Sequence, residues 1–186
     1  MDKKEFREIC IDKLRSSSRA RNYYADKIVS QKLYKYIKDS GSRVVMLYVP
    51  LRIEINIFNL IVRLRKENVT LFVPFMEGKS FRLVKYRLPI KIKKFGVREP
   101  NISNNFYKRI DLAIVPIIGM DKTFRRVGFG KGFYDRFFEK HGDKIDRVIF
   151  VGRQSCICSD VVTDNYDVEG DFYITPNIVF DKKHFK

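Results

Sequence analysis

Residues 111–138, DLAIVPIIGMDKTFRRVGFGKGFYDRFF, are the part of the sequence that indicates the fold most clearly. The first six, Asp111–Pro116, contain four apolar residues in a row and end at a proline, which is typical of a short strand buried on both faces. A glycine-rich turn follows, and we expect a helix beyond it that starts near Gly132. Strand, glycine turn and helix in this order are typical of α/β proteins.

Similar apolar runs occur on both sides of this stretch. Val44–Val49, which is followed by a proline, and Val69–Pro74 precede it, and Arg147–Val151 follows it. Each run predicts a buried strand, and Ile57–Lys66 between the first two has helical spacing. The other expected elements are two N-terminal helices, a strand or hairpin arm and two short late strands: Phe6–Leu14, Arg19–Asp39 closed by Gly41, Phe81–Tyr86, Phe172–Ile174 and Ile178–Phe180.

This alternation predicts an α/β fold, a three-layer sandwich around a mostly parallel sheet. No internal repeat, low-complexity tract or flexible linker interrupts residues 1–186, so we expect a single domain. In such sheets ligands bind at the carboxyl ends of the strands. The loops expected to carry function therefore follow Val49, Val73, Val115 and Val151.

The charge of the chain points first to a polyanionic partner. Lys and Arg number 38 and Asp and Glu 22, which gives a formal net charge of +16, an excess typical of nucleic-acid-binding proteins. Alanine is rare while Lys, Ile, Phe and Asn are frequent, a composition typical of an AT-rich genome that accounts for part of the excess. Residues 79–109 carry +9 (ten basic residues, one acid), whereas residues 154–181 carry −6 (six acids, no Lys or Arg). A protein that coats nucleic acid would not need the acidic segment, so we expect a smaller polyanion.

The three cysteines are too few for a disulfide framework. Cys156 and Cys158 form a C-x-C pair, but neither a second pair nor a nearby histidine completes a zinc site, so we expect reduced, structural thiols. No apolar run reaches the length of a membrane span, and the N-terminus MDKKEFREIC has no apolar signal-peptide region. The sequence therefore predicts a soluble, cytoplasmic protein with no membrane partner.

Phosphate chemistry is indicated by three alternating glycines and three nearby basic residues: Gly128, Gly130 and Gly132, with Arg125, Arg126 and Lys131. Glycine lets backbone N–H groups approach an oxyanion, and basic side chains supply the counter-charge. The N-terminus of the following helix would add N–H donors, and Asp135 in its first turn could hold a metal that bridges phosphates. The segment matches neither the P-loop pattern nor the dinucleotide fingerprint. A tight turn with solvated basic residues is the alternative.

The same segment resembles the signature of the 5-formyltetrahydrofolate cyclo-ligase family, also called 5,10-methenyltetrahydrofolate synthetases. PIIGMD (Pro116–Asp121), Arg126 and GFGKGFYDR (Gly128–Arg136) stand where the family has P-G-L-A-F-D, an arginine and G-x-G-x-G-Y-Y-D-R. Further segments that agree in order are a basic N-terminal helix with Lys3 and Arg7, YVPLRIEIN (Tyr48–Asn56), FGVREP (Phe95–Pro100) and DVEGDFYIT (Asp167–Thr175). The resemblance spans nearly the whole chain.

The resemblance implies a fold shared with NagB and CoA-transferase-like proteins and an ATP-dependent reaction. Its substrate is 5-formyltetrahydrofolate (folinate), its product is 5,10-methenyltetrahydrofolate, and ADP and phosphate are released, with Mg²⁺ as the metal. Transfer of the γ-phosphoryl group makes the formyl oxygen a leaving group, which the N10 nitrogen then displaces. Such an enzyme must align two ligands and neutralise phosphate charge, and it needs no nucleophile of its own.

Three sets of contacts follow from the resemblance. The implied ATP contacts are Lys3, Arg7, Arg126, Val127, Gly128, Phe129, Gly130, Lys131, Gly132, Phe133 and Tyr134, with Lys131 and Arg126 as the catalytic charges at the transferred group. The implied folate contacts are Val49, Glu54, Phe129, Phe133 and Tyr134. The implied magnesium ligands are Asp135 and Asp167.

The residues alone leave several alternatives open. Lys3 and Arg7, one helical turn apart, could form a solvated face, Glu54 could cap a helix, and Asp167 could belong to a turn. The aromatic residues of the glycine segment could be ordinary core. A basic run could attract the glutamate tail of folate or simply form a solvated loop: Lys91, Lys93 and Lys94.

The sequence departs from the family pattern at four positions: Ile117 for a glycine, Phe133 for a tyrosine, Tyr166 for a histidine and Pro176 for an acid. None of these changes removes an implied phosphate or metal ligand, so we expect an active enzyme, and a monomer.

Two other functions compete with this one. They are a basic nucleic-acid-binding protein and a nucleotide-binding enzyme of the same fold that acts on another acceptor, such as a CoA or sugar-phosphate compound.

Overall fold

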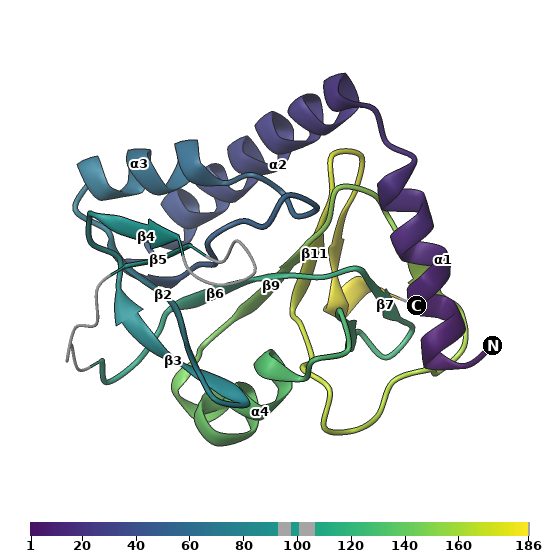
Figure 1. Cartoon of the computed structure of the whole chain (residues 1–186). Coiled ribbons are helices and arrows are strands. Elements are labelled where there is room, and N and C mark those ends of the chain that lie inside the picture. The colour runs from purple at the N-terminus through teal and green to yellow at the C-terminus, as the bar shows by residue number, and fades with distance from the viewer. Residues whose placement is uncertain (93–97, 101–106, 186) are drawn as a thin grey trace.

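The computed structural model describes residues 1–92, 98–100 and 107–185 and is built on a seven-stranded sheet (Figure 1). In spatial order its strands are β12 (Val179–Asp181), β11 (Phe172–Ile174), β9 (Val148–Val151), β6 (Leu112–Pro116), β1 (Val44–Met46), β2 (Thr70–Glu77) and β3 (Ser80–Lys85). The five inner strands run parallel, and the two edge strands run antiparallel to their neighbours. The predicted α/β fold with a mostly parallel sheet is confirmed.

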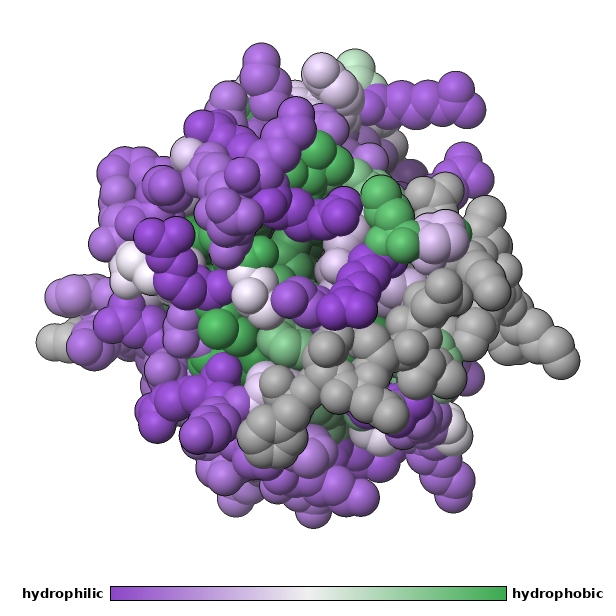
Figure 2. Space-filling view, turned by 90° about the vertical axis from the view of Figure 1, so that its left-hand side faces the viewer, coloured by the Kyte–Doolittle hydropathy of each residue, from purple (hydrophilic) through white to green (hydrophobic). Residues whose placement is uncertain are grey.

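Each face of the sheet has its own apolar core, because successive residues of a strand point to opposite faces. In β1, for example, Val45 belongs to one core and Met46 to the other. The covering helices are α2 (Arg19–Ser40) and α3 (Phe58–Lys66) on the first face and α4 (Phe133–His141) on the second (Figure 1). No helix in the described part of the chain is long and apolar enough to cross a membrane. Figure 2 shows a largely hydrophilic face, with apolar surface visible in recesses between polar side chains.

Helix α2 forms where the sequence predicts it. The Ser18 side chain accepts a backbone N–H of the first turn, and Gly41, with φ +69°, ends the helix. Val29, Leu33 and Ile37 recur at every fourth residue and are buried against the sheet. Burial of this stripe fixes α2 on the first face.

A second, smaller sheet was not predicted. Its strands, in spatial order, are β10 (Ile157–Cys158), β7 (Gly119–Asp121) and β8 (Arg126–Val127). Helix α1 (Lys3–Arg15) packs on it through Phe6 and Cys10. The remaining elements are the antiparallel pair β4 (Ile90–Ile92) and β5 (Arg98–Pro100) and the 3-10 helices η2 (Gly142–Lys144) and η3 (Lys182–His184).

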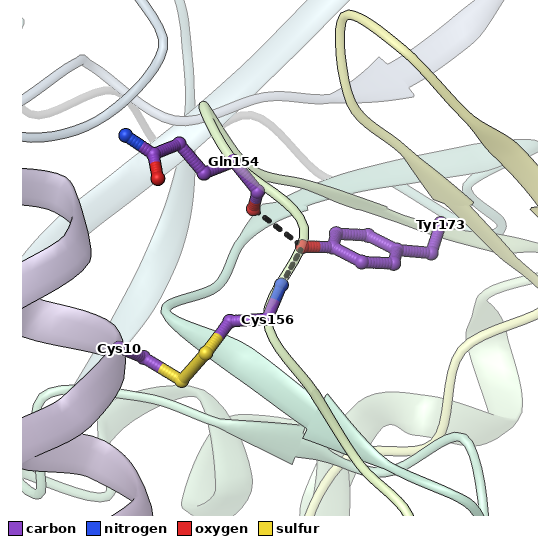
Figure 3. The surroundings of a disulfide bond; sticks show 4 residues. All are labelled: Cys10, Gln154, Cys156 and Tyr173. Atoms are coloured by element: carbon purple, nitrogen blue, oxygen red, sulfur yellow. Dashed lines mark hydrogen bonds between the residues drawn. A yellow bond between two sulfur atoms is a disulfide. The ribbon is translucent and has the colours of Figure 1, made fainter.

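The expectation of reduced thiols is wrong for two of the three cysteines. Cys10 of α1 and Cys156, which precedes β10, form a disulfide, with 5.8 Å between their Cα atoms (Figure 3). The packing of α1 on the small sheet brings together these residues, which lie 146 positions apart in sequence. The Tyr173 hydroxyl donates to the Gln154 carbonyl (2.9 Å) and accepts from the Cys156 N–H (3.4 Å). Cys158 is a buried free thiol.

Two strands end three residues away from the expected position. Strand β1 ends at Met46 instead of Val49: its register with β2 and β6 stops there, the Leu47 N–H donates to the Phe72 carbonyl (2.8 Å), and the Tyr48 hydroxyl donates to the Ile55 carbonyl (2.8 Å). Strand β2 continues to Glu77 because its residues 72–77 pair with β3. Both differences place residues at the edge of the sheet where the cleft described below opens.

Candidate active site

A cleft of about 520 Å³ opens at the carboxyl ends of β1, β2 and β6. Its walls come from the loop after β1, the end of β2, Pro116 at the end of β6, and the glycine segment (residues 128–132) that leads into α4. Three of the segments expected to carry function, those after Val49, Val115 and Val151, contribute to this cleft, the last through Asp164, Tyr166 and Asp167. The residues after Val73 also line it, but Pro74 and Met76 belong to strand β2 and not to a loop.

The glycine segment joins β8 to α4 along one wall. Gly132 is the N-cap of α4 and has φ +63°, a backbone conformation that favours glycine. Arg126 packs so closely on Gly128 that a Cβ atom there would overlap the guanidinium. From α1, Arg7 Nε donates to the Gly128 carbonyl (2.7 Å). The N-terminal helix and the glycine segment, 121 positions apart at this contact, therefore form one surface.

Four basic side chains line the cleft: Lys3, Arg7, Arg126 and Lys131. Arg126 is only 7% exposed, and its Nη1 lies 3.7 Å from Asp135 Oδ1. Its guanidinium lies 4.8 Å from the Tyr134 ring, and its buried Nε has no hydrogen-bond partner among the described residues. A buried guanidinium with an unused donor favours an anionic ligand. Lys131 is exposed, so its ammonium is free to adjust to a ligand.

Lys3 bridges two carboxylates at the cleft. Its Nζ lies 2.5 Å from Asp167 Oδ2 and 3.1 Å from Asp164 Oδ2, and the Asp167 side chain is only 5% exposed. Partial burial alone would lower the pKa of Lys3, but the hydrogen bonds and charges of the two carboxylates outweigh it and raise the pKa. The Tyr166 hydroxyl donates to Asp164 (2.7 Å), and its ring lies 5.3 Å from the Lys3 ammonium. Lys3 is therefore held as a cation.

The donor set of the cleft fits Mg²⁺. Asp135 and Asp167 both line it, and Asp135 Oδ1 accepts the N–H of Val168 (3.3 Å), the residue after Asp167. Among the residues that the structure describes, no group of three or more His, Cys, Asp or Glu could hold a metal by itself. Mg²⁺ commonly binds one or two carboxylates together with substrate phosphates, so a pair of carboxylates suffices. Arg126 and Lys3, which now neutralise this pair, would have to give way to the metal.

Glu54 lies in the loop after β1 and also lines the cleft. Burial raises the pKa of its carboxyl to about 7, although the Leu51 N–H and the charges of Arg126 and Arg153 favour the ionised form. The Leu51 N–H donates to Glu54 Oε2 (2.9 Å). Burial, helped by the charge of Glu54, also raises the pKa of the Tyr134 hydroxyl. A carboxyl that titrates near neutral pH can bind a ligand either as a donor or as an acceptor.

Asp121 is a buried carboxylate that supports the segment carrying Asp164 and Asp167. It accepts the hydroxyl and backbone N–H groups of Thr123 and Thr163 and the N–H of Val162, at 2.5 to 3.0 Å. Burial opposes its ionisation, but these hydrogen bonds outweigh burial and hold its pKa below the ordinary value. The bonds fix the segment that leads into Asp164. The sequence did not indicate this role for the last residue of PIIGMD.

The structure brings together nearly all the residues expected at the site. Every residue expected to contact ATP, folate or magnesium lines the cleft, except Val127. Val127 is buried in the apolar cluster between α1 and the small sheet. The roles assigned to the cleft residues stay predictions.

Several cleft residues were not predicted to be site residues: Tyr48, Leu51, Pro74, Met76, Phe81, Pro116, Asp164 and Tyr166. Asp164 stands three residues before Asp167 in the acidic segment, so the charge pattern could have indicated it. Met76 and Phe81 come from the β2–β3 pair and carry no chemical signal. Lys93 and Lys94, the Lys91 side chain and most of the FGVREP segment lie outside the described residues.

Comparisons with known proteins agree with this arrangement. The model of the 5-formyltetrahydrofolate cyclo-ligase family matches residues 1–176. A curated 5-formyltetrahydrofolate cyclo-ligase from Haemophilus influenzae is 27% identical over 167 residues, which cover 85% of this chain and 89% of the relative. Another, from Mycoplasma pneumoniae, is 24% identical over 175 residues, which cover 94% of this chain and 98% of the relative. The solved structure of a 5,10-methenyltetrahydrofolate synthetase from Aquifex aeolicus superposes with a TM-score of 0.80 at 25% identity, covering 100% of this chain and 95% of that one. A synthetase from Mycoplasma pneumoniae, 23% identical, shares the fold with a TM-score of 0.71 over 95% of this chain and 99% of its own. This chain belongs to the 5-formyltetrahydrofolate cyclo-ligase family.

Proposed function

We propose that this family enzyme uses the cleft to convert 5-formyltetrahydrofolate into 5,10-methenyltetrahydrofolate, with ATP converted to ADP and phosphate. The observation that carries the proposal is the meeting, in one cleft, of four basic side chains, three aspartates and the partly buried Glu54. The basic groups and carboxylates suit a metal-bound triphosphate. Glu54 and the aromatic residues suit a flat, hydrogen-bonding ring system.

The reaction needs activation of the formyl oxygen, which is a poor leaving group. The γ-phosphoryl group of ATP passes to that oxygen, and ADP leaves. The N10 nitrogen then attacks the formyl carbon and loses its proton, the carbon–oxygen bond breaks, and inorganic phosphate departs with the former formyl oxygen. Both steps depend on alignment and on neutralised phosphate charge.

The residues divide between the two ligands. Lys3, Arg7 and the glycine segment hold the triphosphate, and Arg126 and Lys131 neutralise the phosphoryl group in transfer. Val49, Glu54 and the aromatic side chains hold the pterin: Phe129, Phe133 and Tyr134. Asp135 and Asp167 would hold Mg²⁺, which supplies charge neutralisation on the phosphate oxygens when it is bound.

The proposal includes the molecular context. Residues 1–186 act as one domain with a NagB and CoA-transferase-like fold, as a monomer and without a nucleic-acid partner. The location is cytoplasmic.

An absorbance assay tests the activity. Purified protein is mixed with folinate, ATP and Mg²⁺, and the near-ultraviolet absorbance of the methenyl product is followed. We expect a rise that requires all three components and that stops when a chelator removes the metal. A folded protein that gives no ATP-dependent rise would rule out the proposed function.

A further inference from the structure

The loop between β1 and α3, residues 47–57, has no regular secondary structure although it presents Glu54 to the cleft. A side chain on such a loop keeps its place only if other groups hold the backbone. Part of this support is local. Glu54 N–H donates to the Leu51 carbonyl (3.0 Å), Leu51 N–H donates to Glu54 Oε2 (2.9 Å), and the Tyr48 hydroxyl donates to the Ile55 carbonyl (2.8 Å).

Two residues outside the cleft supply further support: Asp26 of α2 and Arg153 in the loop after β9. Arg153 Nη2 lies 3.1 Å from both Asp26 oxygens, and its Nε lies 3.2 Å from Oδ1. Arg153 Nη1 donates to the Arg52 carbonyl (2.9 Å), and Asp26 Oδ1 accepts the Asn56 N–H (2.9 Å). The ion pair therefore holds the loop two residues before and two residues after Glu54.

The Asp26–Arg153 ion pair is largely shielded from solvent. The Arg153 side chain is 9% exposed and that of Asp26 is 17% exposed, and neither residue lines the cleft. Exposed ion pairs contribute little to structure, whereas a bidentate pair that is largely buried and also bonded to backbone fixes geometry and is costly to break from one side. The charge of Arg153 also acts on Glu54, as does that of Arg126.

We propose that Asp26 and Arg153 are positioning residues for folate binding and act through Glu54. This inference rests on the proposed function, in which Glu54 contacts the folate. Loss of the pair frees the backbone on both sides of Glu54. It leaves the ATP contacts in place, since those come from α1 and the glycine segment. The expected signature is a loss of folinate affinity with little change in the KM for ATP.

Three variants test the inference. Asp26→Asn and Arg153→Gln each remove one charge of the pair, and Arg153→Lys keeps the charge but cannot bond Asp26 and Arg52 as the guanidinium does. We expect the KM for folinate, and its Kd from titration calorimetry without ATP, to rise about 10-fold or more in the first two variants and by a smaller factor in the third. The KM for ATP should stay within about two-fold of wild type.

Two matched controls remove charges of the same kind from exposed ion pairs. Asp39→Asn breaks the pair with Lys35 on the same helix as Asp26, and Arg109→Gln breaks the pair with Asp146. Both should leave the folinate Kd and the KM for ATP unchanged.

Wild-type folinate affinity in Asp26→Asn and Arg153→Gln would overturn the inference. So would equal losses of folinate and ATP affinity, because a general structural defect lowers both. If Arg153→Gln does not fold, Arg153→Lys decides, and an unchanged folinate Kd in that variant overturns the inference. A wild-type protein without turnover contradicts the proposed function, whereas an active wild type with unaffected variants contradicts only the positioning role.

Discussion

Arg126 packs over Gly128 with no space left for a side chain: a Cβ atom at position 128 would overlap the guanidinium. Arg126 is nearly buried, and its Nη1 faces Asp135 at 3.7 Å, so the guanidinium cannot swing away without leaving that carboxylate. The glycine thus allows a buried cation to stand at the wall of the cleft. This relationship gives the first prediction.

Gly128→Ala should displace Arg126 without unfolding the protein. Because the displaced guanidinium no longer meets the phosphoryl group, we expect kcat/KM for ATP to fall about 10- to 100-fold, with the melting temperature Tm lowered by only a few degrees. Gly142→Ala is the control, because the nearest atom to a Cβ there is Phe138 Cδ1 at an ordinary 3.8 Å. Wild-type kcat/KM in Gly128→Ala would show that the position of Arg126 is unimportant.

Asp135→Asn tests the metal assignment. The amide oxygen can still accept the Val168 N–H, so the fold should persist, but the charge that attracts Mg²⁺ is lost. We expect the Mg²⁺ concentration for half-maximal activity to rise about 10-fold or more, measured by titrating the metal at saturating ATP and folinate. Asp143→Asn, at an exposed carboxylate just beyond α4, is the control. Full activity of Asp135→Asn at low Mg²⁺ would make the assignment wrong.

Glu54 should make the protein less stable as pH rises. Its pKa is about 7 in the folded state against an ordinary 4.5, so between these values the folded state binds more protons than the unfolded state. Because the folded state holds this extra proton, the free energy of unfolding falls as pH rises from about 4.5 to about 7, by at most about 3 kcal/mol. Above this range it falls no further on account of Glu54. In Glu54→Gln the free energy of unfolding should fall less as pH rises, and above pH 7 the variant should be more stable than wild type. Urea unfolding at a series of pH values measures this, and an unchanged pH dependence would contradict the burial of an ionisable Glu54.

The Cys10–Cys156 disulfide should stabilise α1 and, with it, the cleft residues Lys3 and Arg7 that this helix carries. Its removal in the double variant Cys10→Ser and Cys156→Ser, or by a reductant, should lower the free energy of unfolding by about 2–5 kcal/mol. The KM for ATP should rise as well, because α1 carries Lys3 and Arg7. Cys158→Ala removes a thiol outside the disulfide and serves as the control. Equal stability with and without reductant would contradict the prediction.

The sequence predicts those elements that bury regular apolar patterns. The run at Leu112–Val115 is a fully buried strand, and the serine and glycine at the ends of α2 act as its caps. The short strands of the second sheet were missed because two or three residues carry no periodicity. They form because α1 and the chain around Cys156 pack against them.

The site was predictable where its residues lie in one contiguous motif, as in the glycine segment. The contacts that support it depend on distant parts of the chain. The Asp26–Arg153 pair joins residues 127 positions apart, and the disulfide joins residues 146 apart, so no local pattern indicates either. The five hydrogen bonds of Asp121 likewise require the fold, because three of them come from Val162 and Thr163.

The path of the formyl oxygen tests the central claim most directly. Folinate labelled with ¹⁸O in the formyl group is converted by the enzyme in the presence of ATP and Mg²⁺, and the released inorganic phosphate is analysed by phosphorus NMR or mass spectrometry. Phosphorylation of the formyl oxygen predicts one ¹⁸O atom in each phosphate released. Unlabelled phosphate, or turnover without ATP, would contradict the account.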